Sequence, residues 1–270
     1  MSNHLIEIGG VSFRAASSAN SGFWLTFKEH GWENFTFGLL KEHLSPGSVF
    51  LDIGCWEGPF TLYAASLGAV VHAIDADNRA ITQLRENIKL NPHLINNIHI
   101  HNIALTDEDK PVNLYERRNF GDSASSLLMR SRDSGNFAGV QGKTFNTFIR
   151  ESNITKIDFI KMDIEGGEFI ILPGMKGSLK QLGHPPLLIA FHSVYLKESY
   201  INRYTILRKL SKLNGKLSIA LGRLFAGKYA GEKIADVLND LSEYKTRIAE
   251  EKHKQLIKNI QHDSLVFFKK

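Results

Sequence analysis

Three carboxylates follow one short apolar segment in the second half of the chain. Asp163, Glu165 and Glu168 lie within six residues, directly after residues 157–162, which we predict to form a buried strand. Buried charges need partners, and a capped helix start accounts for one acid but hardly three. Such groups can act as a general base, bind substrate hydroxyls or hold a hard cation. His192 follows the next apolar run and would stand at the same edge of the sheet, as a catalytic group or as an ordinary rim residue.

A glycine-bearing turn follows the apolar residues 49–51 and precedes a helix predicted over 60–67. In open α/β sheets, ligands bind at the carboxyl ends of the strands, where glycine lets the backbone come close. The turn carries Asp52, Gly54 and Gly58, whereas a dinucleotide loop would carry Gly-x-Gly-x-x-Gly and hold a diphosphate. An acidic residue suits the ammonium group of S-adenosylmethionine (AdoMet) better than a diphosphate. A tight turn without a ligand is the alternative.

Asp75 ends the next predicted strand, residues 70–74, and lies 21 residues after Gly54. A carboxylate at this place can accept hydrogen bonds from both hydroxyls of a ribose. It could equally cap the following helix, a role for which Asp77 and Asn78 compete. Together with the glycine turn, it predicts a nucleoside-type cofactor whose adenine lies at the end of the third strand. The predicted cofactor-binding residues are Glu33, Asp52, Gly54, Trp56, Gly58, Asp75, Ala76, Asn102, Ile103, Ala104 and Asp163.

Alternating apolar runs and helix-length segments must position these groups. The pattern predicts an α/β fold: a doubly wound, mostly parallel, seven-stranded Rossmann-like sheet with helices on both faces. We predict strands over 5–13, 49–51, 70–74, 98–103, 112–115 (in a hairpin), 157–162, 187–191 and 265–268, with a loop over 125–142. We predict helices over 33–44, 60–67, 77–90, 145–151, 200–213 and 233–259, and a short one around 169–172 stopped by Pro173-Gly174.

The predicted organisation is one domain with additions at both ends. Residues 1–31 form an N-terminal extension, 32–199 the cofactor-binding core, and 200–270 a helical insertion whose last strand returns to the sheet. A hydrophobic content of 43% supports one large core. The single cysteine, Cys55, excludes an intrachain disulfide and a zinc site built from thiolates.

Cysteine usage and targeting signals suggest a cytoplasmic protein. One cysteine favours a reducing compartment, and the start of the chain has no signal-peptide pattern. The longest stretch without Asp, Glu, Lys or Arg, residues 58–74, is too short and too interrupted to span a membrane. Peripheral contact with a membrane remains open.

Basic residues are concentrated at the end of the chain. Residues 201–270 hold 15 Lys and Arg against 7 Asp and Glu, a balance of +8, while residues 1–200 hold 18 against 21, a balance of −3. This is either a solvated helical face or an attraction for an anionic partner such as an acidic glycan or a phosphorylated lipid carrier. Aromatic and basic residues are not interleaved there, which disfavours nucleic acid. The favoured cluster is Lys209, Lys212, Lys216, Arg223 and Lys228.

These segments together resemble the FkbM family of AdoMet-dependent methyltransferases. The similar stretches are residues 49–62, 73–77, 102–105 and, most selectively, 158–168 followed by Leu172-Pro173-Gly174. The resemblance covers about residues 32–193 and the closing strand. It implies transfer of a methyl group to a hydroxyl, mostly of a sugar, glycolipid or secondary metabolite.

The family commonly has a glutamate near position 190, where this chain has Ala190. We therefore expect Asp163, Glu165 or His192 to act as a base, with a divalent metal possible but not favoured. The expected acceptor is a hydroxyl-bearing saccharide or glycolipid, with an RNA or small-molecule methyltransferase as the alternative. An NAD-linked oxidoreductase is disfavoured by the acidic turn, and a non-catalytic binding module by the three acids.

Overall fold

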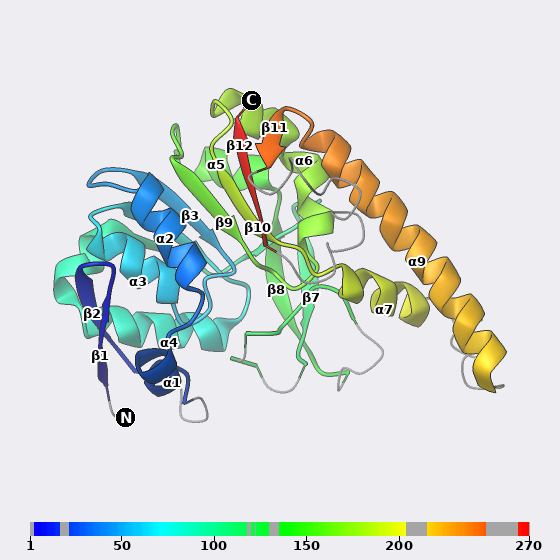
Figure 1. Ribbon diagram of the computed structural model, residues 1–270, viewed down its shortest axis with the longest axis horizontal. Coiled ribbons are helices and arrows are strands. Elements are labelled where there is room, and N and C mark those ends of the chain that lie inside the picture. The colour runs from blue at the N-terminus through cyan, green and yellow to red at the C-terminus, as the bar shows by residue number, and fades with distance from the viewer. Residues whose placement is uncertain are drawn as a thin grey trace.

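A seven-stranded sheet forms the centre of the protein (Figure 1). The computed structural model describes residues 3–16, 22–117, 120–121, 123–129, 135–203, 215–246 and 264–269. Along the sheet the order is β11 (Tyr244–Thr246), β12 (Ser264–Lys269), β10 (Leu187–Ala190), β9 (Phe159–Met162), β3 (Val49–Ile53), β4 (Val70–Ile74) and β5 (Ile98–His101). The five strands from β10 to β5 are parallel, whereas β12 is antiparallel to both of its neighbours. The doubly wound α/β fold and the returning final strand are confirmed.

Each face of the sheet carries its own apolar core. Successive side chains of a strand point to opposite faces, so Phe50 packs in one core while its neighbour Leu51 packs in the other. The first core contains α2 (Asn34–His43), α3 (Pro59–Ser66) and α4 (Asn78–Lys89). The second contains α5 (Phe145–Glu151), α6 (Glu168–Gln181), α7 (Ser193–Arg203) and part of α9 (Gly215–Asp240). Strands that are buried on both faces explain the continuous apolar runs in the sequence.

A small second sheet lies beside the carboxyl end of β5. It pairs β6 (Ala104–Leu105) with β8 (Phe137–Lys143), and β8 with β7 (Pro111–Tyr115). The hairpin predicted around 112–115 is confirmed, but the loop prediction for 125–142 is wrong in its last part, because β8 occupies it. That strand contains Gly139 and Gly142 and few β-branched residues, so its propensity is weak and pairing with β7 decides its conformation.

The N-terminal segment also differs from its prediction. The single strand expected over 5–13 is a hairpin of β1 (His4–Ile8) and β2 (Val11–Ala15), which turns at Gly9 and Gly10. Both glycines have positive φ angles, 59° and 90°, which favour glycine in a tight turn. An unpredicted helix, α1 (Phe23–His30), follows.

Three helical predictions need correction. Helix α6 continues through Pro173 to Gln181, because Met175 and Leu179 on its later turns are buried in the core and packing outweighs the lost hydrogen bond. The helix predicted over 233–259 begins earlier, since α9 already starts at Gly215, and it ends at Asp240 before β11. The helix predicted over 200–213 also begins earlier, because α7 starts at Ser193, and the part of the prediction after Arg203 lies outside the described residues.

Helix α9 packs against α6 and α7 and runs along one side of the domain, with its first turns projecting beyond α7 (Figure 1). A short 3₁₀ helix, η1 (Pro92–Asn97), joins α4 to β5. Among the described residues, no helix is long and apolar enough to cross a membrane.

Three histidines form a row across β4 and β5. The ring of His72 stacks on those of His99 and His101, with centroids 5.0 and 5.3 Å apart, and its Nδ1 lies 3.0 Å from Nε2 of His101. Burial, reinforced by the neighbouring imidazoles, lowers the pKa of His72 to about 4. Burial likewise lowers the pKa of His101 to about 4. The folded protein therefore keeps this pair neutral.

We expect acid to destabilise the fold through this pair. An unfolded histidine titrates near pH ~6.5, so below that pH the unfolded chain binds protons that the folded pair does not. The stabilisation is complete above pH ~6.5 and is lost as the pH falls toward 4. In His72→Gln, urea denaturation at a series of pH values should show a shallower fall of unfolding free energy over this range. His93→Gln, at an exposed position, is the control and should follow wild type, whereas an unchanged slope in His72→Gln would contradict the assignment.

Candidate functional site

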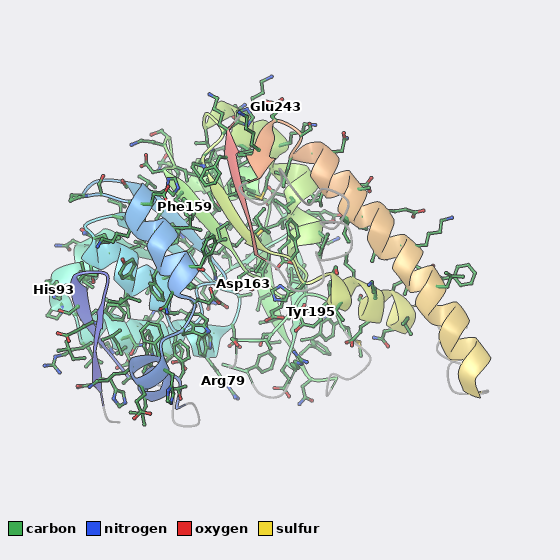
Figure 2. All side chains as sticks on the ribbon, in the orientation of Figure 1. Arg79, His93, Phe159, Asp163, Tyr195 and Glu243 are labelled. Atoms are coloured by element: carbon green, nitrogen blue, oxygen red, sulfur yellow. The ribbon has the colours of Figure 1, made fainter. Side chains whose placement is uncertain are left out.

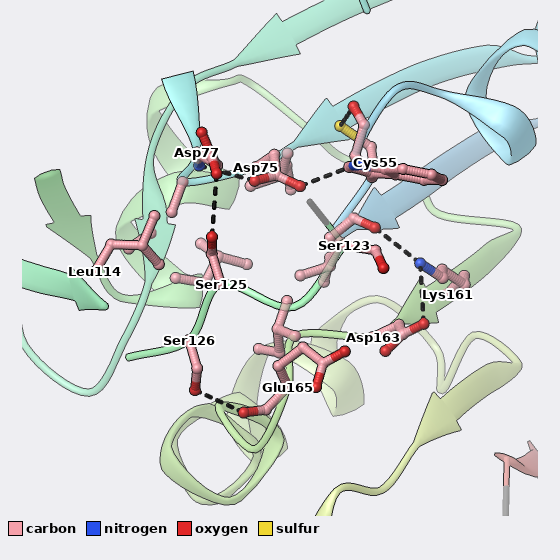
Figure 3. Close-up of a pocket in the computed structure, with 18 of the residues that line it drawn as sticks. Cys55, Asp75, Asp77, Leu114, Ser123, Ser125, Ser126, Lys161, Asp163 and Glu165 are labelled. Atoms are coloured by element: carbon pink, nitrogen blue, oxygen red, sulfur yellow. Dashed lines mark hydrogen bonds and ion pairs between the residues drawn. The ribbon is translucent and has the colours of Figure 1, made fainter. Parts of the chain in front are cut away.

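A cavity of about 270 Å³ opens at the carboxyl ends of the parallel strands (Figure 3). Its walls come from the segments after β3, β4, β5 and β9, from residues 123–127 and from the start of α2. Its volume is close to the lower end of the range for small-molecule sites, ~300–1,000 Å³. Of the predicted cofactor residues, those that line it are Glu33, Gly54, Trp56, Asp75, Ala76, Ile103, Ala104 and Asp163, and Glu165 lines it as well.

Asp75 is held in place by two backbone donors. Its Oδ2 accepts from the N–H of Trp56 at 2.9 Å, and its Oδ1 accepts from the N–H of Asp77 at 2.8 Å. Burial raises the pKa of Asp75 to about 6, against the opposing effect of these two hydrogen bonds. The carboxylate is thus fixed in orientation at the edge of the cavity, and each oxygen can accept a further hydrogen bond.

Asp77 is the cap of α4, so this role does not fall to Asp75. Its Oδ1 accepts from the N–H of Arg79 at 2.8 Å. Its Oδ2 accepts from the N–H of Gly121 and the hydroxyl of Ser125, at 2.6 and 3.1 Å. One carboxylate therefore ties the wall formed by residues 123–127 to the β4 side of the cavity (Figure 3).

The two glycines of the first turn serve the packing of the protein itself. Gly54 has a φ of 79°, and a Cβ on it would lie 1.9 Å from the carbonyl oxygen of Asp163. Gly58 has a φ of 91°, and a Cβ there would lie 2.3 Å from a methyl group of Leu84. The sequence interpretation assigned the glycines to close approach of a ligand. In the structure Gly54 lines the cavity and also lets the turn after β3 lie against the turn after β9, whereas Gly58 does not line the cavity.

Lys161, in the middle of β9, is a site residue that sequence reasoning missed. Its side chain is buried, and Nζ donates to the carbonyl oxygen of Gly54 at 2.8 Å. The same nitrogen lies 3.7 Å from Oδ1 of Asp52 and 3.9 Å from Oδ2 of Asp163. Burial lowers the pKa of Lys161, but the surrounding carboxylates outweigh that effect and raise it. A lysine within the apolar run Phe-Ile-Lys-Met was the signal that could have found it.

Asp52 and Asn102 lie behind the cavity wall. Asp52 is fully buried, and its Oδ2 accepts from the hydroxyl of Thr61 at 2.6 Å. The sequence predicted that Asp52 contacts the ammonium group of AdoMet directly. In the structure Asp52 does not line the cavity, and its positive partner is the ammonium group of Lys161. Asn102 donates from Nδ2 to the carbonyl oxygens of Asp75 and Ala76, at 3.0 and 3.3 Å, and so supports the turn that carries them.

The second chemical element is the acid–histidine cluster, which we define as Asp163, Glu165, Glu168 and His192. Nε2 of His192 lies 3.7 Å from Asp163 and 3.8 Å from Glu165, and its Nδ1 lies 3.3 Å from Glu168. Burial lowers the pKa of His192, but the hydrogen bond to Glu168 and the three negative charges raise it to about 9. Burial raises the pKa of Glu165, partly opposed by His192. The structure thus brings together all three residues predicted to be catalytic.

Tyr195 connects this cluster to the protein surface. Its ring lies parallel to that of His192, with centroids 5.4 Å apart, and its hydroxyl accepts from the guanidinium of Arg117 at 2.8 Å. Figure 2 shows Asp163 at the end of the central strands and Tyr195 on α7. Arg117 is exposed and therefore places a positive charge beside the cluster.

The Methyltransferase FkbM domain model matches residues 52–206, more than half of the chain. The chain belongs to the FkbM methyltransferase family. The match spans the cofactor turn, Asp75 and the whole acid–histidine cluster, so the FkbM domain contains every group described above except Glu33. The resemblance inferred from the sequence is confirmed.

Curated relatives share shorter stretches with this FkbM protein. A ribosomal protein L11 methyltransferase from Caldanaerobacter subterraneus is 40% identical over 54 residues, which are 20% of this chain and 18% of that protein. A ribosomal protein L11 methyltransferase from Campylobacter lari is 43% identical over 70 residues, 26% of this chain and 25% of that protein. The matched segments thus span about a fifth to a quarter of these relatives.

Solved methyltransferase structures align with most of the chain. The methyltransferase FkbM from Methylobacillus flagellatus aligns with a TM-score of 0.44 and 14% identity, covering 87% of this chain and 51% of that one. A TehB-like SAM-dependent methyltransferase from Corynebacterium glutamicum aligns with a TM-score of 0.43 and 12% identity, covering 92% and 95% of the two chains.

Replacing the buried ammonium of this FkbM domain should be costly. In Lys161→Met, Asp52 keeps its buried carboxylate without a positive partner, and breaking a buried pair costs about 3–5 kcal/mol of unfolding free energy. Urea denaturation of the purified variant measures this loss. Lys156→Met is the matched control, because the exposed Lys156 pairs with the partly buried Asp158 at the protein surface, and such surface pairs contribute little. If Lys161→Met unfolds like Lys156→Met, the ammonium is not what stabilises Asp52.

Proposed function

We propose that this protein is an AdoMet-dependent methyltransferase that transfers a methyl group to a hydroxyl of a sugar, glycan or glycolipid. One observation carries the proposal. The cavity that holds the fixed carboxylate of Asp75 is the same cavity that Asp163 and Glu165 line, so a nucleoside site and a cluster of proton-accepting groups share one space. Transfer between two bound molecules requires such proximity.

The residues of the cavity fit AdoMet. Asp75 offers two oriented oxygens to a ribose diol, and Ile103, Ala104 and Leu114 offer an apolar wall to an adenine. In place of Asp52, the carboxylate of Glu33 lines the cavity, where it accepts from the hydroxyl of Thr36 at 2.9 Å. We assign Glu33 to the ammonium group of the cofactor.

The remaining chemistry concerns the acceptor. When bound, AdoMet supplies an electrophilic methyl group on a sulfonium. A hydroxyl is a poor nucleophile until its proton is removed, and Asp163 and Glu165 present carboxylates that can hold that proton. Nε2 of His192 lies 3.7 Å from Asp163 and 3.8 Å from Glu165, so its positive charge balances theirs.

An anionic acceptor remains part of the proposal. Arg117 supports it, because its guanidinium is exposed and bonded to Tyr195 beside the cluster. The basic cluster expected from the sequence is only partly visible. Lys209 and Lys212 and the side chains of Lys216 and Arg223 lie outside the described residues, and Lys228 is exposed on α9. A cytoplasmic location is proposed on the basis of the lone buried thiol of Cys55.

The acceptor class can be tested directly. The protein is incubated with methyl-labelled AdoMet and a lysate fractionated into glycans, lipids, RNA, proteins and small molecules. Label in the glycan or lipid fraction supports the proposal. Label confined to RNA, protein or small molecules would contradict the proposed acceptor and identify a methyltransferase for that class instead. Because the relatives described above are named ribosomal protein L11 methyltransferases, the protein fraction is the first alternative to examine.

We expect Asp75→Asn to weaken AdoMet binding more than tenfold. Loss of a charge-assisted hydrogen bond costs about 1.5–3 kcal/mol, and the amide cannot accept from both Trp56 and Asp77 as the carboxylate does. Calorimetric titration with AdoMet measures the change, and parallel titration with NAD tests the dinucleotide alternative. Asp236→Asn, at an exposed position on α9, should bind like wild type. Wild-type affinity in Asp75→Asn would contradict the cofactor placement.

A further inference from the structure

Three potential metal ligands converge at the wall of the cavity. A carboxylate oxygen of Asp163, a carboxylate oxygen of Glu165 and a ring nitrogen of His192 all lie within 4.8 Å of one another. Nε2 of His192 is 3.7 Å from Asp163 and 3.8 Å from Glu165, which is longer than a hydrogen bond. Ligand atoms that share one ion at roughly 2.0–2.2 Å are separated by about 3–4 Å. The two distances from His192 fall in this range, and the third pair of atoms lies within 4.8 Å, so the three groups surround one space that a cation could occupy.

One of these atoms lacks a close partner. Oε2 of Glu165 is buried and has no direct hydrogen bond within the described part of the chain, and its ion pair with Nε2 of His192 is long, at 3.8 Å. Leaving a buried charged acceptor unsatisfied is costly. A cation between Glu165, Asp163 and His192 would satisfy it.

Glu168 holds His192 in the orientation that a ligand needs. It is fully buried, and its two oxygens accept from the N–H groups of Ile164 and Gly166, each at 2.9 Å. Its Oε1 also lies 3.3 Å from Nδ1 of His192. In metal sites, a histidine ligand usually donates its other ring N–H to a carboxylate, which fixes the tautomer and the ring plane. Glu168 thereby aims Nε2 at the two remaining acids.

We propose that Asp163, Glu165 and His192 bind a divalent cation, with Glu168 as the positioning residue. Two carboxylates and one imidazole suit Mn²⁺, Fe²⁺ or Zn²⁺ better than Ca²⁺. Because Asp163 and Glu165 line the cofactor cavity, the open coordination positions face the space where an acceptor hydroxyl would lie. A cation there would bind the hydroxyl oxygen and lower its pKa.

This proposal reverses the preference derived from the sequence. The metal-free site was preferred because Ala190 stands where the family commonly has a glutamate. In the structure the third ligand comes from His192, two residues later and just beyond the end of β10.

Mn²⁺ is the probe for the test, and neither AdoMet nor an acceptor is present. Protein freed of metal with EDTA is titrated with MnCl₂ by calorimetry and by electron paramagnetic resonance of free Mn²⁺. We expect one site in wild type and at least roughly 100-fold weaker binding in Asp163→Asn, Glu165→Gln and His192→Gln. Glu168→Gln should weaken binding roughly 10–100-fold, as removal of outer-shell partners typically does. Glu108→Gln, an exposed acid paired with Lys110, is the control and should bind like wild type.

Thermal unfolding of every variant in EDTA shows whether it is folded before the titration is interpreted. Absence of Mn²⁺ binding by wild type, or unchanged binding in the three ligand variants, would overturn the proposal. The imidazolium of His192 would then be what neutralises the two carboxylates. Such a result leaves the methyltransferase proposal intact, since that proposal fails only if AdoMet does not bind or no methyl group is transferred.

Discussion

The buried ammonium group of Lys161 is the interaction on which the site depends. It lies among carboxylates that three separate segments contribute: Asp52 from β3, Asp163 from the turn after β9, and Glu33 from the start of α2. A carboxylate as buried as Asp52 cannot stay charged without a nearby cation. The same ammonium donates to the carbonyl oxygen of Gly54, which packs on Asp163. One side chain thus joins the cofactor turn to the acidic turn and sets their relative position.

The electrostatic character of the cavity follows from this arrangement. Glu33, Asp75, Asp163 and Glu165 line it, and Lys161 is the basic side chain among the lining residues of the described chain. Such a space repels a diphosphate and suits a ligand that carries ammonium and sulfonium groups. It also suits the divalent cation proposed above. The acidic residues of the turns, visible in the sequence, therefore lie together in the folded protein and give the cavity its negative charge.

Much of the fold could be predicted because its signals are local. Strands such as β4 and β10 are continuous apolar runs, and Asp75, Asp163 and His192 could be placed by the rule that ligands gather at the carboxyl ends of parallel strands. Features that depend on contacts between residues far apart in the sequence could not be predicted. Strand β8 is defined by its pairing with β7, and α6 passes Pro173 because of core packing. Likewise, the lysine within an apolar run marks Lys161 as unusual, but its pairing with Asp52, more than a hundred residues away, cannot be read from the sequence.

The position of β12 between β10 and β11 has a consequence for how the protein is made. Synthesis proceeds from the N-terminus, and β12 begins at Ser264, long after β10 ends at Ala190. Until those last residues leave the ribosome, β10 is an edge strand with unpaired backbone groups, and β11 has no neighbour to pair with. The nascent chain therefore carries an open, apolar sheet edge throughout the synthesis of α7 and α9. That interval is when chaperone contact, or aggregation in its absence, has its best opportunity.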